Sequence, residues 1–156
     1  MTTKNPDAPP LDFITFYLQE MLCGIELSQV ESIHKLGEIT QPYQAADYVM
    51  GLINLRGRIV TVLDLHRKLG FAISASTQES HVIIVRDGEE IIGLLVDRIG
   101  DAITVPVDSW EQPSVNIGGN QQNHFRGVCK MKHELIAILD LDEVLKPEQH
   151  SSGMTL

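Results

Sequence analysis

Positive charge and aromatic side chains are scarce in this sequence, and each shortage excludes a class of function. Lys and Arg number 12 against 21 Asp and Glu, which gives a formal net charge of −9. Binding to nucleic-acid phosphates or anionic lipids needs clustered Lys and Arg, so we predict neither nucleic-acid binding nor a membrane-surface role. Aromatic residues make up only 5% of the chain, which disfavours the aromatic-lined grooves that bind proline-rich peptides.

Long hydrophobic runs are missing as well. No apolar run approaches the ~18 residues that span a bilayer, so we expect no direct membrane insertion. Residues 1–10 are polar, contain three prolines and lack the apolar centre of a signal peptide. We therefore expect a cytoplasmic protein with flexible tails at 1–10 and 147–156. In that compartment the two cysteines, Cys23 and Cys129, which lie in apolar runs, are expected to be free buried thiols.

Clustered catalytic or metal-binding residues are not found in the sequence. The six histidines include no pair at helical metal-binding spacing, and no cysteine lies near enough to complete a zinc site. The glycines at 118–119 and 51–57 lack the Lys-Ser/Thr sequence that completes a phosphate-binding loop. We therefore predict that the protein is not an enzyme and has no cofactor and no metal.

What the sequence does contain is short β-strands. Runs rich in Val, Ile and Leu, bounded by turn residues, predict strands at 13–18, 22–27, 58–63, 81–85, 91–96 and 135–139. The Asp-Gly pair within 86–89 indicates a tight hairpin. Helical patterns are few and short, at 45–51, 65–69 and 142–145. Short strands joined by tight turns predict an all-β barrel or sandwich fold.

Three blocks of sequence recur in the same order, which predicts two copies of one small β-unit. The block at Gly24 resembles the block at Gly93, and Asn-Leu-Arg-Gly at 54–57 resembles His-Phe-Arg-Gly at 124–127. The block that ends in Asp64-Leu65 and the block that ends in Asp140-Leu141 are farther apart in the sequence than the two earlier pairs of blocks. We assign the additional residues to a longer hairpin at 130–133.

Each copy, at 13–70 and 81–146, is small enough that its own core would be marginal, so we expect the two to pack together. A gap between two such units is a natural place for a ligand or partner. Asp64 and Asp140 each follow an apolar run and precede a short helical stretch. We interpret both as helix N-caps rather than as catalytic acids.

Residues 51–65, Gly-Leu-Ile-Asn-Leu-Arg-Gly-Arg-Ile-Val-Thr-Val-Leu-Asp-Leu, resemble the central signature of the CheW family of chemotaxis coupling proteins. The flanks agree, at Gly24-Ile25 and Val30 upstream and at 93–96 downstream, and the resemblance covers residues 13–146. It implies an all-β fold of two intertwined five-stranded SH3-like barrels with a few short helices. On this basis we expect one CheW-like domain over residues 11–146.

The resemblance also implies a function, a pair of partners and a binding site. The protein would be a scaffold that joins the regulatory domain of the histidine kinase CheA, itself CheW-like, to the cytoplasmic tip of a chemoreceptor. The receptor's helical hairpin would lie in a groove between the barrels. Arg56 matches the family arginine linked to coupling, and Gly51 and Val30 match positions tied to receptor binding. Asn54 and Gly57, which flank Arg56 in the motif, are assigned to the same partner-binding site.

One position departs from the family pattern. Many relatives carry Glu directly before the Ile that matches Ile33, whereas this sequence has Ser32 there, preceded by Glu31. Strand alternation predicts that residues 31 and 32 point to opposite faces. Which of the two takes the place of the family's carboxylate contact is left open by the sequence.

Other functions compete with this interpretation. The same adaptor role could serve a pilus-motility or other chemosensory system instead of flagellar chemotaxis. A different SH3-like module that binds peptides or nucleic acid is disfavoured by the net charge and by the shortage of aromatic residues. A small β-barrel enzyme is disfavoured because no acid, base or nucleophile is clustered in the sequence.

Overall fold

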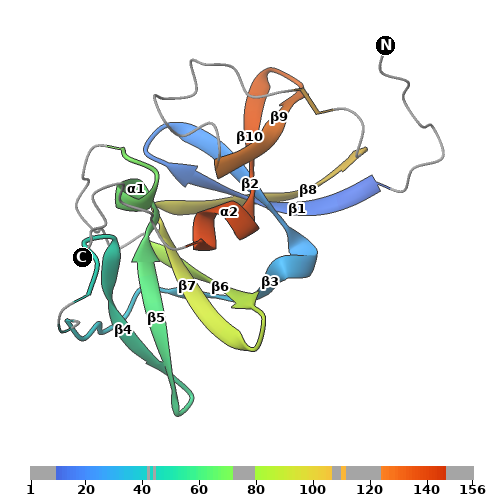
Figure 1. Ribbon diagram of the computed structural model, residues 1–156. Helices are drawn as coiled ribbons and strands as arrows, with labels where there is room; N and C mark the ends of the chain where they lie inside the picture. Colours follow the sequence, from blue (N-terminus) through green and yellow to red (C-terminus); the bar gives the residue numbers. More distant parts are fainter. Residues whose placement is uncertain are drawn as a thin grey trace.

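The computed structural model describes residues 10–41, 43, 45–71, 80–106, 110–111 and 124–146. Within them the strands form two five-stranded sheets (Figure 1). The first sheet has the order β8 (Arg98–Pro106), β1 (Pro10–Leu18), β2 (Met21–Glu26), β10 (Glu134–Leu139) and β9 (Phe125–Met131). The second has the order β3 (Val30–Lys35), β6 (His81–Asp87), β7 (Glu90–Val96), β5 (Arg58–Asp64) and β4 (Val49–Leu55). Three short helices complete it: η1 (Leu27–Gln29), α1 (Leu65–Lys68) and α2 (Leu141–Leu145).

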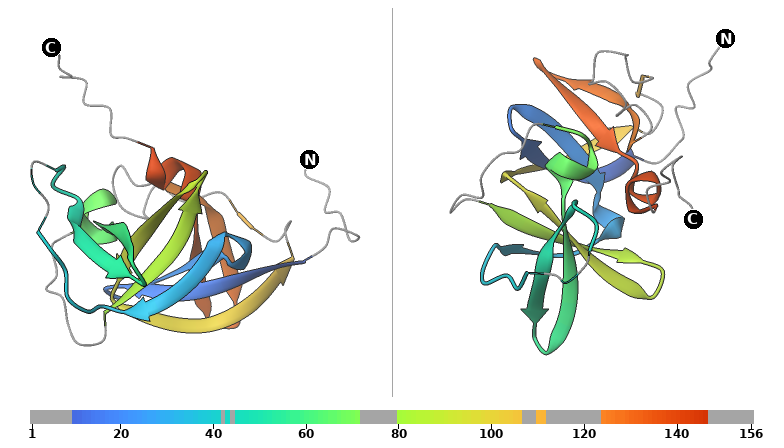
Figure 2. Two further views of the ribbon diagram at one scale, coloured as in Figure 1. Left: turned by 90° about the horizontal axis from the view of Figure 1, so that it is seen from below. Right: turned by 60° about the vertical axis from the view of Figure 1, so that its left-hand side comes forward.

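The two sheets are intertwined because each combines strands from both halves of the sequence: β1 and β2 with β8 to β10 in the first sheet, and β3 to β5 with β6 and β7 in the second. Strand β3 follows β2 along the chain but pairs with β6 of the second sheet. Strand β8 follows β7 but crosses back to pair with β1 of the first sheet. The exchange is visible in the blue and yellow ribbons of Figures 1 and 2. Strands β1 to β5 thus correspond to β6 to β10 in order, and the expected fold of two intertwined SH3-like barrels is confirmed.

Three hydrophobic cores explain why several strands are apolar along their whole length. A small core lies on one side of each sheet, and a larger central core is built from residues of both sheets. In β6, for example, Val82 and Ile84 face the small core of the second sheet, while Ile83 and Val85 face the central core. Because successive strand residues point to opposite faces, a strand between two cores must be apolar at every position.

Helices α1 and α2 occupy equivalent places after β5 and β10, and both contribute to the central core through Leu65 and Val144. Asp64 caps α1 by accepting a hydrogen bond from the backbone N–H of His66 at 3.0 Å. Asp140 caps α2 by accepting one from the backbone N–H of Glu143 at 3.3 Å. The interpretation of both aspartates as helix N-caps is confirmed, and their matching places support the predicted repeat.

The register of the repeat differs from the one that the sequence indicated. Both hairpins that were compared have two-residue turns, since Leu55 pairs with Arg58 and Met131 pairs with Glu134. The structural counterpart of Arg56 is therefore Lys132, and both adopt positive φ, at 56° and 54°. The prediction of a longer second hairpin was wrong, because the additional residues of the second copy precede β9.

The predicted helix at 45–51 was also wrong. Residues Val49–Leu55 form strand β4, in which Gly51 pairs with Val62. Pairing with a neighbouring strand outweighs the weak helical pattern of the segment. The predicted tails lie outside the described residues, except that Pro10 already belongs to β1.

Two equivalent glycines make room for side chains inside the small cores. A Cβ on Gly93 would lie 2.7 Å from Val82 Cγ1 and 3.2 Å from Val62 Cγ2. At Gly24 the nearest atom would be Ile136 Cγ2, at 3.3 Å. The second sheet therefore packs more tightly over its glycine than the first sheet does.

This difference predicts unequal effects of the same substitution. Gly93→Ala should lower the free energy of unfolding by about 1–3 kcal/mol, because the added methyl group overpacks a filled core. Gly24→Ala should cost distinctly less, since only small shifts of a flexible Ile are required. Urea unfolding of the two variants tests this, and an equal or larger loss for Gly24→Ala would contradict the packing described here.

Candidate partner-binding site

The Asn-Leu-Arg-Gly motif forms the tip of the β4–β5 hairpin, which projects from the second sheet at the bottom of Figure 1. Arg56 and Gly57 are the two turn residues, with φ of 56° and 85°. The Asn54 side-chain carbonyl accepts a hydrogen bond from the backbone N–H of Gly57 at 2.8 Å. Positive φ at a residue with a side chain costs roughly 1–2 kcal/mol, so the bond from Gly57 helps to hold a conformation that Arg56 would not adopt alone.

Arg56 is exposed, as the sequence interpretation expected. No ion pair joins its guanidinium to a carboxylate within the described segments. An exposed guanidinium on a rigid turn can form planar, two-pronged hydrogen bonds with a partner, and Arg is enriched in protein interfaces.

Arg56 lies at the edge of a groove between β3 and the β4–β5 hairpin, which we call the hairpin groove. It comprises a cavity of about 260 Å³ that Arg56 lines together with Arg58 and Glu31, and a neighbouring cavity of about 530 Å³. His34 and Leu55 line both cavities. The walls mix apolar side chains with cations and a carboxylate, so the groove suits a partner segment that is both apolar and charged.

A β-bulge corrects the expectation that Glu31 and Ser32 face opposite sides. The pairing of β3 with β6 shifts between Val30 and Ser32, which leaves Glu31 as the additional residue. As a result both Glu31 and Ser32 line the hairpin groove. Glu31 forms an exposed ion pair with Arg86 at 3.2 Å, and Ser32 contacts the His34 ring at 2.9 Å. Glu31 therefore brings a carboxylate to the face on which Ser32 lies.

Gly51 and Val30 lie farther from the surface than Arg56. Gly51 is buried, and a Cβ at this position would lie 2.6 Å from the backbone oxygen of Thr40. This close approach allows Thr40 and Leu52 to exchange two backbone hydrogen bonds of 2.8 Å. Val30 is half-buried and packs against the central core. Of the five residues assigned to the site, the structure exposes Asn54, Arg56 and Gly57 together at one turn, while Gly51 and Val30 support the surrounding backbone.

Two large exposed side chains were missed by the sequence interpretation. Ile59 is 65% exposed and lies beside Arg58 on the β4–β5 hairpin, and Leu135 is 64% exposed on the β9–β10 hairpin. The corrected repeat makes them counterparts, each one residue into the second strand of its hairpin. Strand alternation places Ile59 and Val60 on opposite faces, so Ile59 points away from the small core that Val60 faces.

The other predicted features concern thiols, metals and membranes. Cys23 and Cys129 are buried and form no disulfide, as expected, and burial raises the pKa of the Cys23 thiol. Within the described ranges, no group of three His, Cys, Asp or Glu side chains could hold a metal ion. In the same ranges, every helix is too short or too polar to cross a bilayer.

Comparison with known proteins identifies the family. A family model described as "CheW-like domain" matches residues 12–149. The chain belongs to the CheW family. The chemotaxis protein CheW of Rhizobium meliloti is 28% identical, covering 91% of this chain and 92% of its own. CheW of Bacillus subtilis is also 28% identical, covering 90% of each chain.

A more distant relative and a solved structure extend the comparison. Protein FrzA of Myxococcus xanthus is 22% identical over 88% of this chain and 87% of its own. The crystal structure of the scaffolding protein TtCheW from Thermoanaerobacter tengcongensis superposes with a TM-score of 0.80 and 26% identity. That match covers 94% of this chain and 95% of the other, so the SH3-like barrels described here are those of CheW.

The Asn54 hydrogen bond leads to a prediction about the CheW hairpin. Asn54→Ala removes the acceptor for the Gly57 N–H and should cost about 0.5–1.5 kcal/mol of stability. It should also speed amide exchange at Gly57 more than in the rest of the second sheet. Asn54→Asp, which keeps an acceptor oxygen, is the matched control. Equal exchange at Gly57 in Asn54→Ala and the original protein would show that Asn54 does not hold the turn.

Proposed function

We propose that this protein is a non-enzymatic cytoplasmic adaptor that couples chemoreceptors to the histidine kinase CheA in a chemosensory array. Membership of the CheW family, whose members are scaffold or adaptor proteins, supports the general role. The observation that carries the proposal is Arg56, exposed on a positive-φ turn at the edge of the hairpin groove. Its partners are the CheA regulatory domain and the cytoplasmic tip of a chemoreceptor.

The hairpin tip has the physical character of a binding surface rather than of a structural element. Arg56, Arg58 and Ile59 are all exposed there, so the tip joins two cations to an apolar side chain. Interface centres commonly combine an Arg with apolar contacts that exclude water. The chain's net charge of −9 makes such a local concentration of cations distinctive.

The corrected repeat supports an adaptor that can hold two partners at once. Lys132 and Leu135 on the β9–β10 hairpin are the counterparts of Arg56 and Ile59. The two hairpins belong to different sheets and lie at opposite ends of the molecule in Figure 1. Two similar but separate surfaces allow one small protein to bridge two other proteins.

A second candidate is the same adaptor role in a non-flagellar chemosensory system. The observation that favours this second system is the similarity to FrzA, which, unlike the relatives from Rhizobium meliloti and Bacillus subtilis, is not named as a chemotaxis protein CheW. Capture of receptors and kinase from lysate of the source cells, followed by identification of the captured proteins, separates the two systems.

Replacing Arg56 tests the proposed role directly. Arg56→Ala should change stability by no more than ~0.5 kcal/mol, because the side chain is exposed. Binding of a partner in a reconstituted receptor–kinase assay should weaken by ~1–3 kcal/mol if Arg56 is central to the interface. Lys132→Ala, at the equivalent turn of the other hairpin, also removes a cation and should leave the affinity of that partner unchanged. Strong destabilisation of Arg56→Ala with normal coupling per folded molecule would overturn the assignment.

Ile59 gives an independent test of the same surface. Ile59→Ser should weaken the partner that Arg56→Ala weakens, because both side chains lie on one hairpin. Leu135→Ser, the matched variant on the other hairpin, should leave that partner's affinity unchanged. Separate binding measurements with the kinase regulatory domain and with a receptor-tip fragment show which partner this is. Loss of different partners in Arg56→Ala and Ile59→Ser would contradict a single binding surface.

A further inference from the structure

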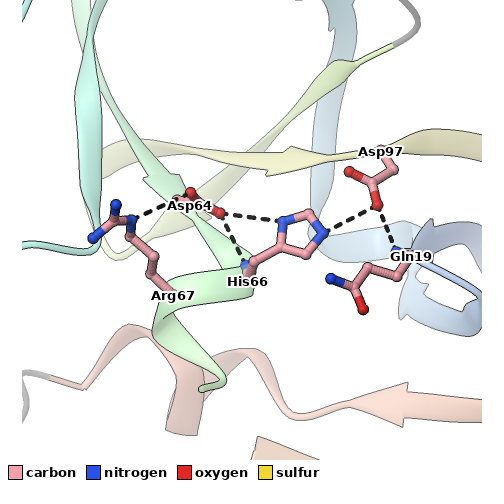
Figure 3. Close-up of polar contacts among 5 residues, drawn as sticks. All are labelled: Gln19, Asp64, His66, Arg67 and Asp97. Atoms are coloured by element: carbon pink, nitrogen blue, oxygen red, sulfur yellow. Dashed lines mark hydrogen bonds and ion pairs between the residues drawn. The ribbon is translucent and has the colours of Figure 1, made fainter. Parts of the chain in front are cut away.

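A buried histidine lies between two carboxylates at the place where the chain crosses from one sheet to the other (Figure 3). His66 is only 2% exposed and belongs to α1, which follows β5 of the second sheet. Its Nδ1 lies 3.3 Å from Asp64 Oδ1, and its Nε2 lies 3.0 Å from Asp97 Oδ2. Both ring nitrogens therefore face an acceptor.

Asp97 connects this histidine to the first sheet. It lies between β7 of the second sheet and β8 of the first, and its backbone N–H donates to the Tyr17 carbonyl at 3.0 Å. The carboxylate oxygen that faces His66 also accepts the backbone N–H of Gln19, in the turn between β1 and β2. The chain of contacts from Asp64 through His66 and Asp97 to Gln19 thus joins α1 to the first sheet.

The protonation state of His66 decides whether both contacts can exist together. A neutral imidazole carries one N–H, so it donates to one carboxylate and turns a lone pair toward the other. An imidazolium donates from both nitrogens, and each hydrogen bond then joins opposite charges. The observed geometry fits the imidazolium.

We propose that Asp64, His66 and Asp97 form a proton-dependent clamp between the two sheets, closed while both ring nitrogens of His66 carry a proton and weakened when one proton is lost. The proposal does not depend on which partners the protein binds. The clamp affects how strongly α1 and the second sheet are bound to the segment at Asp97, where the chain crosses from β7 to β8.

The charged groups around the clamp are compatible with a protonated His66. Arg67, the next residue of α1, places its Nε 3.9 Å from the other oxygen of Asp64. Lys68 points away, donating to the Lys146 carbonyl at 3.0 Å, and Arg98 stacks on the Tyr17 ring at 4.1 Å. Glu20, in the same turn as Gln19, is exposed. Two carboxylates therefore face the imidazole directly, and Phe71 covers it with an edge-on ring contact.

The electrostatic balance agrees with the geometry. The hydrogen bond to Asp64 raises the pKa of His66 above its usual value; burial opposes this increase, and the charge and hydrogen bond of Asp97 support it. Burial alone would raise the pKa of Asp64, but its hydrogen bonds to His66 and the charge of that ring together lower it. A raised histidine pKa contributes stability that is complete below the unfolded pKa of about 6.5 and is lost as pH rises through the folded pKa.

The clamp is present in only one of the two copies of the repeat. The counterpart of His66 is Asp142, and the counterpart of Asp97 is Ser28. Neither can supply an imidazole, so the equivalent crossover cannot form the same pair of contacts. The repeat itself therefore does not require a histidine here, which separates the clamp from the needs of the fold.

Titration of the ring nitrogens by NMR tests the proposal in the original protein. We expect both His66 nitrogens to be protonated at low pH and the midpoint of their titration to lie above the usual value of about 6.5. Asp97→Asn removes one charged acceptor and should move that midpoint to lower pH. A midpoint at or below about 6.5, or a midpoint that Asp97→Asn does not lower, would overturn the proposal.

Stability measurements supply a second readout. The urea midpoint of the original protein should fall between pH 6 and pH 9, and this fall should be smaller in His66→Gln. His133→Gln, which removes an exposed imidazole from the β9–β10 turn, is the matched control and should retain the original fall. Equal falls in the original protein and His66→Gln would contradict a clamp. If His66→Gln does not fold, Asp97→Asn replaces it in the same comparison.

Discussion

The central core between the two sheets is the constraint on which the rest of this structure depends. It contains buried side chains from β1, β2, β9 and β10 of the first sheet, from β5, β6 and β7 of the second, and from both α-helices. Each fully buried Leu, Ile or Phe side chain contributes roughly 1.5–3 kcal/mol, so separating the sheets would expose more apolar surface than a small domain can tolerate. The exchanged strands β3 and β8 add a covalent constraint, because each is tied to a strand in the opposite sheet. The two barrels therefore form one unit, and the hairpin tips extend from a rigid base.

Because the core holds the sheets together, the exposed side chains at the hairpin tips are not needed to stabilise the fold. In β5, Val60 and Val62 pack in the small core of the second sheet and so hold the strand in place. Ile59, which lies nearer the turn, is exposed and contributes little to packing. Arg56 is placed by its backbone turn and by Asn54 rather than by contacts of its own side chain. Under the proposed function, this placement keeps the charge of Arg56 available to a partner while its position is set by the sheet. For an adaptor, which acts only by placing other proteins, this separation between fold and contact surface is the useful property.

The sequence predicted the strands that are apolar along their length, because both faces of these strands meet a core. It failed for β3, β8 and β9, which carry charged or polar residues on an exposed face and so resemble loops, and for β4, the start of which was assigned to a helix. The exposed Arg56 could be predicted, since its motif is short and local. The common face of Glu31 and Ser32 could not, because a β-bulge is set by pairing with β6 and leaves no clear mark in β3 alone. The pair of His66 and Asp97 is separated by 31 residues and depends on the strand crossover, which no local pattern reveals.

The corrected register of the repeat separates what the fold requires from what this chain has added. Asp64 and Asp140 recur because each small helix needs a cap. Gly51 and Gly127 recur because a Cβ at either position would lie only 2.6 or 2.7 Å from the backbone oxygen of a neighbouring segment. Both copies need apolar packing and helix caps, so symmetry at those positions carries no functional information. The exposed pairs Arg56/Lys132 and Ile59/Leu135 are different, since neither the core nor the turn needs a cation or a large apolar side chain in water. Under the proposed function, recurrence at such positions fits two surfaces that bind related partners, and the replacement of Arg by Lys gives the two surfaces different hydrogen-bonding geometry. Similar surfaces with unequal chemistry allow one adaptor to hold two proteins and still distinguish between them.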